Sequence, residues 1–184
     1  MSENGSKHQE YKFSESELEE INKHLAKYPD PKSAVMPTLW IAQNKYNWLS
    51  KEAIQLVADT LKLPFAHVYG VATFYTQYYK KPVPKYVFDV CTCFACGELG
   101  GDEVLEHAKA YTKCDAKGHS EDGLFYFRHA ECLGSCDTGP MCQVTNKHYV
   151  HNLNKEKIEG VINDLRNGKE PGFVSIPLID QSKI

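Results

Sequence analysis

Four of the seven cysteines form two close pairs, Cys91-x4-Cys96 and Cys132-x3-Cys136, and 35 residues separate the pairs. A separation of this size fits one βαβ-like segment, which can return the second pair to the side of the first. Thiolates are the soft ligands that iron–sulfur clusters require, and a 2Fe-2S unit takes four, two on each iron. The spacing therefore predicts one 2Fe-2S cofactor, with Cys91, Cys96, Cys132 and Cys136 as candidate cofactor-binding and metal-ligating residues.

Two other kinds of site compete for these thiols. Structural zinc is one, although zinc ribbons usually join two short knuckles, which the 35-residue separation fits poorly. A dithiol redox site is the other, because Cys93-Phe-Ala-Cys96 is a C-x-x-C motif. Thioredoxin motifs open a helix directly, whereas we expect Cys96 to lie in a loop, with Gly-Glu-Leu-Gly-Gly following it before any helix. A Rieske centre would need Cys-x-His or Cys-x-x-His in each binding loop, and neither occurs.

The other three cysteines are weaker candidates for a chemical role. Cys93 is placed to replace a neighbouring ligand, whereas Cys114 and Cys142 are expected to be partly buried residues without a chemical role. Glycines at 97, 100, 101 and 134 would let the backbone wrap closely around a cluster and direct N–H groups at its sulfurs.

The elements around the cysteines alternate between strand and helix patterns. Strands are expected at 86–90, 124–129 and 141–145, a hairpin turn at Asn146-Lys147, and helices at 102–113 and after Asn154. Cys91 would then end the first strand, and Cys132 and Cys136 would lie in the loop after the second. This order predicts a small thioredoxin-like sandwich, with helices packed on a short mixed sheet.

The N-terminal part of the chain has helical periodicity instead. A capping box at Ser14–Glu17 opens one helix, a second spans 33–46 with Asn47 as its left-handed stop, and Ser50 caps a third. A fourth, expected over 65–79, is dense in aromatic residues, which indicates core packing or a partner surface. We therefore expect an α+β protein with a disordered segment at 1–12, a helical bundle at 13–80, a thioredoxin-like 2Fe-2S domain at 84–170 and a tail at 171–184. Lys80–Pro84 is the boundary.

Composition excludes several classes of function. A formal net charge of −3 and a pI near 6.2 argue against nucleic-acid binding. No apolar stretch approaches a bilayer-spanning length, so direct membrane insertion is not expected, and the acidic N-terminus has no signal core. We therefore expect a cytoplasmic protein, in which an odd number of cysteines indicates ligands and spare thiols rather than disulfides.

Three phrases resemble a known family: the cysteine quartet, Tyr69-Gly-Val-Ala-Thr-Phe-Tyr75, and Glu131-Cys-Leu-Gly-Ser-Cys136 followed by Gly139-Pro140. Together they resemble the thioredoxin-like 2Fe-2S subunit of respiratory complex I, the small iron–sulfur component of NADH:quinone oxidoreductase. The resemblance covers about residues 13–168. This chain departs from the family pattern at Gly139, where alanine is common, and at Cys93, which adds a thiol to the first loop.

The resemblance implies a helical bundle followed by a thioredoxin-like domain, with Cys91, Cys96, Cys132 and Cys136 as cluster ligands. It also implies a partner, the FMN- and NADH-binding flavoprotein of the same complex, with which the cluster would exchange one electron. FMN and NADH would belong to that partner, and no catalytic residue or stand-alone NADH activity is expected here. The complex would place the chain in a peripheral arm on the cytoplasmic side of the inner membrane, and exposed aromatic residues would let isolated copies form a homodimer.

Two alternatives stay open. The same type of protein resembles parts of the diaphorase module of NAD(P)-linked hydrogenases and formate dehydrogenases. In a structural zinc or adaptor protein, by contrast, the aromatic helix would be the functional surface.

Overall fold

The computed structural model describes residues 10–169 of the 184-residue chain, and the chain divides into two compact units between Val83 and Pro84. The division falls within the Lys80–Pro84 segment that the sequence marks as a boundary. Of the expected disordered segment 1–12, only residues 10–12 are described, and the expected tail 171–184 lies wholly outside the described residues.

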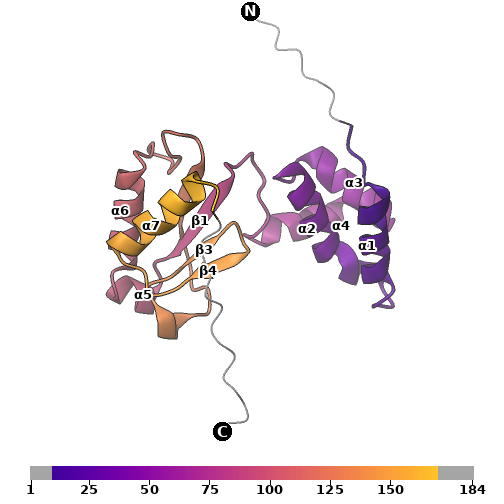
Figure 1. Ribbon diagram of the computed structural model, residues 1–184. Helices are drawn as coiled ribbons and strands as arrows, with labels where there is room; N and C mark the ends of the chain where they lie inside the picture. The colour runs from indigo at the N-terminus through magenta and orange to yellow at the C-terminus, as the bar shows by residue number, and fades with distance from the viewer. Residues whose placement is uncertain (1–9, 170–184) are drawn as a thin grey trace, which may run out of the picture. The chain divides into compact units, whose positions relative to one another are not determined.

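The first unit is built from helices. They are α1 (Glu15–Leu25), the 3-10 turn η1 (Pro31–Ala34), α2 (Val35–Tyr46), α3 (Lys51–Leu61) and α4 (Phe65–Phe74), drawn in indigo to magenta in Figure 1. Their apolar faces meet in one core whose fully buried side chains include Ile21, Leu39, Leu49 and Ile54.

Local signals in the sequence correctly located three of the helix ends: the start of α1, the end of α2 and the start of α3. Ser14 and Glu17 form the expected capping box, in which each side chain accepts a hydrogen bond from the other's backbone N–H. Asn47 stops α2 in the left-handed conformation, with φ of 68°, and the Ser50 hydroxyl caps α3 by accepting from the Ala53 N–H. These three predictions are confirmed.

The prediction of a helix over 65–79 was wrong in length, because α4 ends at Phe74. Tertiary hydrogen bonds compete for the backbone that would continue it. The Gln43 side-chain amide donates to the Gln77 carbonyl and accepts from the Tyr79 N–H, while the Tyr79 carbonyl accepts from the Leu49 N–H. The aromatic residues consequently divide between two roles: Tyr78 and Tyr79 are buried, whereas Phe74 is largely exposed.

The second unit is a four-stranded sheet in the order β2-β1-β3-β4. Its elements are β1 (Tyr86–Cys91), α5 (Phe94–Glu98), α6 (Gly101–Tyr111), β2 (Phe125–Ala130), η2 (Cys136–Thr138), β3 (Cys142–Val144), β4 (His148–Val150) and α7 (Lys155–Arg166). Strand β1 pairs in parallel with β2 and antiparallel with β3, and β3 and β4 form the expected hairpin. The mixed sheet with packed helices confirms the predicted α+β, thioredoxin-like fold class.

Helices α6 and α7 lie on the same face of this sheet (Figure 1). Alternate strand residues, including Phe88, Phe125 and Phe127, pack with Leu105 and Ile162 from these helices to form the core. On the opposite face, Arg128 forms a two-point ion pair with the buried carboxylate of Asp89 across the β1–β2 register.

The outer edge of β2 is partly covered by the loop that precedes it. The Phe127 N–H donates to the Gly118 carbonyl, the Ser120 N–H donates to the Phe125 carbonyl, and His119 forms a bridge with Tyr126. Gly118 has φ of 91°, and a Cβ placed there would lie 2.2 Å from the Phe127 carbonyl oxygen. Only glycine therefore lets the loop lie this close to the strand.

Candidate metal centre

The first thiol pair is built into the end of β1 and the helix that follows it. Cys91 is the last residue of β1, and its N–H donates to the Met141 carbonyl at 3.0 Å. Cys96 lies within α5, which corrects the expectation that it sits in a loop with no helix until after Gly101. Both thiols are almost fully buried, where they pack against Met141.

The short helix α5 was missed because its five residues give too little periodicity to detect. Cys93 precedes it in an extended conformation, and the Gly97 N–H donates to the Cys93 carbonyl. The C-x-x-C motif therefore does open a helical turn, so the argument that set aside a dithiol site on this ground was mistaken. The position of Cys91 against Cys96 still favours a site larger than the Cys93–Cys96 pair.

Close backbone approach at Gly101 holds this pair against α6. A Cβ at Gly101 would lie 2.6 Å from the Cys91 carbonyl oxygen and 2.8 Å from that of Cys96, far inside van der Waals contact. Gly100, with φ of 91°, makes the turn into α6 in the left-handed region. The lack of a side chain at Gly101 therefore lets the start of α6 lie directly on the backbone of both candidate ligands.

The second thiol pair lies in the loop after β2. Cys132 and Cys136 are exposed, and their Sγ atoms lie 3.3 Å apart. Cys136 starts the short turn η2, and the Gly134 N–H donates to the Cys132 Sγ at 3.4 Å. This is the kind of backbone N–H-to-sulfur contact that the glycines of the loops were expected to allow.

The two pairs influence each other's ionisation. Burial raises the pKa of the Cys96 thiol to about 11, with further contributions from its hydrogen bond to Cys91 and from the nearby Cys136. The hydrogen bond that the Cys136 thiol donates to Cys132 raises the pKa of Cys136, and the nearby Cys91 and Cys93 raise it further. The Gly134 N–H lowers the pKa of Cys132, because it stabilises the thiolate.

This donor set fits a cationic two-iron core. Thiols that raise one another's pKa resist forming four adjacent thiolates unless a cation neutralises them. Within residues 10–169, no group of three or more cysteine, histidine or acidic side chains converges as it would around one ion. The thiols are instead arranged as two pairs, and two thiolates per iron is the ligand count of a 2Fe-2S unit.

The other cysteines separate into two groups. Cys93 contacts the same small cluster of buried residues as Cys91 and Cys96. Cys142 is fully buried in the main core on the helix-covered side of the sheet, and burial raises its pKa. Cys114 is partly buried and donates to the Gly118 carbonyl. The expectation that Cys114 and Cys142 are buried or partly buried is confirmed.

Sequence reasoning missed the residues that hold the second loop. Side-chain hydrogen bonds connect this loop to the end of β4. On the loop, Ser135 and Thr138 bond to His151, and the Leu133 carbonyl accepts from Tyr149. No short motif marks them, because the partners are brought together only by the β3–β4 hairpin.

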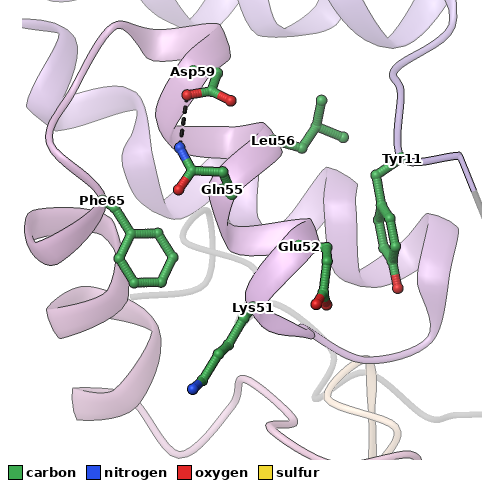
Figure 2. Close-up of a pocket in the computed structure, with 7 residues that line it drawn as sticks. All are labelled: Tyr11, Lys51, Glu52, Gln55, Leu56, Asp59 and Phe65. Carbon is green, nitrogen blue, oxygen red and sulfur yellow. Dashed lines mark hydrogen bonds between the residues drawn. The ribbon is translucent and has the colours of Figure 1, made fainter.

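The first unit contains a separate surface pocket of about 400 Å³, shown in Figure 2. Tyr11 and Phe65 stand at its two ends, and α3 supplies the residues between them, among which Gln55 donates to Asp59. Its lining contains no cysteine or histidine and mixes both signs of charge. This pocket has no donor set comparable to the paired thiols.

The paired thiols and the fold around them match a known protein family. The profile of the thioredoxin-like [2Fe-2S] ferredoxin family covers residues 21–166. The chain belongs to this family. The resemblance read from the sequence is thereby confirmed, and the chain is a 2Fe-2S protein of the thioredoxin-like type.

Curated relatives of this 2Fe-2S protein extend over most of its length. An NADH-quinone oxidoreductase subunit of Rickettsia bellii is 35% identical over 160 residues, which cover 85% of this chain and 95% of that one. NADH-quinone oxidoreductase subunit 2 of Thermus thermophilus is 30% identical over 167 residues, covering 90% and 92%. The relatives are thus subunits of an oxidoreductase complex, as the sequence predicted.

A solved structure shares the fold. An NAD+-reducing [NiFe]-hydrogenase in the air-oxidized state superposes with a TM-score of 0.59 and 15% identity, over 79% of this chain and 24% of that one. At this identity the similarity concerns the fold alone. Among residues 10–169, no helix is long and apolar enough to cross a membrane.

Proposed function

We propose that Cys91, Cys96, Cys132 and Cys136 hold the 2Fe-2S cluster of this ferredoxin. The observation that carries this proposal is the arrangement of the thiols, since a buried pair and an exposed pair lie close enough to shift each other's pKa. When bound, the cluster accepts and returns one electron at a time.

The protein residues around the thiols have separate tasks. Met141 and the other residues packed around Cys91 and Cys96 exclude water from these two thiols. The Gly134 N–H stabilises negative charge on the Cys132 sulfur, which favours the electron-rich state of the centre. Burial opposes added negative charge, whereas N–H donors and solvent favour it, so this balance sets the reduction potential.

The partner, we propose, is the flavoprotein of an NADH-oxidising module, which carries FMN and NADH and exchanges one electron with this chain. The relatives named as NADH-quinone oxidoreductase subunits support this assignment. Phe94 and Leu99 also support it, because they bracket Cys96 in sequence with 82% and 58% of their surfaces exposed. Exposed apolar side chains beside a redox centre are suited to contact with a protein partner.

The assembly proposed is NADH:quinone oxidoreductase, in which this chain would occupy a peripheral arm on the cytoplasmic side of the inner membrane. A diaphorase module of a hydrogenase or formate dehydrogenase is the alternative assembly. Mass spectrometry of the complex that co-purifies with the tagged chain separates the two. Quinone-module subunits support the proposal, whereas a nickel- or molybdenum-containing subunit refutes it.

The ligand assignment is tested on chain purified anaerobically without chelator. Two irons and two acid-labile sulfides per chain, with an EPR signal after dithionite reduction, are expected. Serine at any of the four proposed ligands should remove or distort the signal, whereas Cys114→Ser and Cys142→Ser should retain it. Colourless protein with one zinc would refute the cluster, and a requirement for Cys114 or Cys142 would refute the ligand set.

A further inference from the structure

The second ligand loop is exposed and has little regular structure of its own. Between β2 and β3, a stretch that the structure describes throughout, its only regular element is the three-residue turn η2, and both of its thiols face solvent. A cluster needs its ligands held within roughly 0.5 Å of their working positions. Contacts from elsewhere must therefore hold this loop.

Those contacts come from one short segment, Tyr149–Leu153, at the end of β4 and before α7. The Tyr149 hydroxyl donates to the Leu133 carbonyl at 2.9 Å, between the two cysteines in sequence. The Asn152 N–H donates to the Thr138 carbonyl at 2.8 Å, and the Leu153 N–H donates to the Pro140 carbonyl at 2.7 Å. The segment thus bonds to the loop on both sides of Cys136.

His151 adds a side-chain network to these backbone contacts. Its Nδ1 lies 2.6 Å from the Thr138 Oγ1 and 3.3 Å from the Ser135 Oγ, and these two hydroxyls lie 2.8 Å from each other. Ser135 is buried and immediately precedes Cys136. The network therefore fixes the backbone on which the Cys136 thiol is carried.

The segment is itself anchored. The Tyr149 ring packs against the buried cluster of Cys91, Cys96 and Met141, and it meets the His151 ring edge-on at 5.9 Å between centroids. The Lys157 ammonium on α7 donates to the His151 carbonyl. The Tyr149–Leu153 segment therefore contacts residues around both thiol pairs.

We propose that Tyr149 and His151 are positioning residues for the cluster, which clamp the Cys132–Cys136 loop against the buried Cys91–Cys96 pair. This inference rests on the proposed ligand set. The clamp acts through the Leu133 carbonyl and the Ser135 and Thr138 hydroxyls, and neither residue touches the metal itself. Loss of either contact lets the exposed ligand pair move away from the buried pair.

The test uses variants that remove one hydrogen-bonding group at a time in the purified holoprotein. Tyr149→Phe deletes the hydroxyl, Thr138→Val replaces the hydroxyl with a methyl group, and His151→Leu deletes the ring nitrogens. His151→Asn is the conservative variant, because its amide can donate or accept near the position of Nδ1. Tyr126→Phe and His107→Leu are matched controls in the same unit, the second of which breaks the contact to Glu159 on α7.

Two measurements report on the clamp. The first is the rate at which an iron chelator bleaches the visible absorption, together with the EPR spectrum of the reduced protein. A net hydrogen bond contributes about 1 kcal/mol, so each lost contact should accelerate bleaching about fivefold and shift the EPR signal. The second is deuterium exchange in peptides covering 131–140, which should accelerate in the same variants.

The pattern across the variants decides the question. The clamp predicts faster bleaching and faster loop exchange in Tyr149→Phe, Thr138→Val and His151→Leu, with recovery in His151→Asn and wild-type values in both controls. Wild-type bleaching, EPR and exchange in the three clamp variants would overturn it, as would equal effects in His107→Leu, which would indicate general destabilisation. Loop exchange is also compared across the variants in iron-free protein, and failure of the proposed cluster is recognised separately, by iron and sulfide analysis of the wild type.

Discussion

The close contact between Gly101 and the backbone of Cys91 and Cys96, the two buried proposed ligands, makes Gly101→Ala a sharp test of the first half of the proposed site. The new Cβ would lie 2.6 Å from the Cys91 carbonyl oxygen and 2.8 Å from that of Cys96. Both obstacles are backbone atoms, one at the end of β1 and one within α5, so neither can move aside as a flexible side chain would.

The magnitude follows from these distances. Ordinary van der Waals contact begins at about 3.4 Å, so the carbonyl oxygens of Cys91 and Cys96 must move away by about 0.8 and 0.6 Å. Such displacements exceed the roughly 0.5 Å within which a working site must be held. Overpacking of this kind costs about 1 to 3 kcal/mol, and we expect the upper part of that range because two rigid carbonyls are affected.

The assay compares iron and sulfide content after anaerobic reconstitution, the EPR spectrum and the thermal midpoint. Gly100→Ala is the matched control, because Gly100 has φ of 91° and nothing within 4 Å of an added Cβ. It should cost about 1 to 2 kcal/mol through left-handed strain, while cluster content and EPR stay at wild-type values. Gly101→Ala should instead lose most of its iron.

Full iron content with an unaltered EPR spectrum in Gly101→Ala would refute this reasoning. Equal loss of iron in the two variants would also count against it, because instability alone would then explain the effect.

Three further predictions concern the rest of the chain. Arg128→Met should lower the free energy of unfolding by about 2 to 3 kcal/mol, as measured by urea titration, because it leaves the Asp89 carboxylate buried without its cation, while the partial exposure of Arg128 moderates the loss. After iron removal, iodoacetamide at neutral pH should label Cys132 well before Cys96, because the pKa of the first thiol is lowered and that of the second is raised to about 11; peptide mass spectrometry showing the reverse order would contradict this. Ser14→Ala should cost about 1 kcal/mol of unfolding free energy, because the Glu17 N–H loses the Ser14 hydroxyl as its acceptor while the Ser14 backbone N–H still donates to the Glu17 carboxylate. An unchanged urea midpoint would show that α1 does not contribute to the cooperative unit.

Much of the fold could be read from local patterns. The capping box at Ser14, the left-handed stop at Asn47 and the alternation in β2 depend on neighbouring residues, so the sequence alone carries them. The end of α4 could not be found in this way, because the Gln43 amide that competes for its last turn comes from another helix. Helix α5 was not predicted because a helix of five residues is too short to show a hydrophobic period.

The candidate site shows the same division. The spacing of the cysteines is enough to predict a shared cluster, since each pair is local and one helix-strand segment, α6 and β2, separates the pairs. Tyr149 and His151 contact the second loop because the β3–β4 hairpin places them beside it. No rule based on sequence spacing predicts this placement. The burial difference between the two thiol pairs likewise follows from the packing of Met141 rather than from residue type.

The loop that covers β2 has a consequence for association between copies of the chain. An uncovered strand edge offers unpaired N–H and carbonyl groups to any other strand, and this is a common route to aggregation. Over Phe125 to Phe127 the preceding loop already hydrogen-bonds to that edge, and this pairing requires a residue without a side chain at Gly118. A larger residue at position 118 would push the loop away from β2 and expose an unpaired strand edge. Gly118 therefore reduces the risk of strand pairing between copies of the chain as well as shaping the loop.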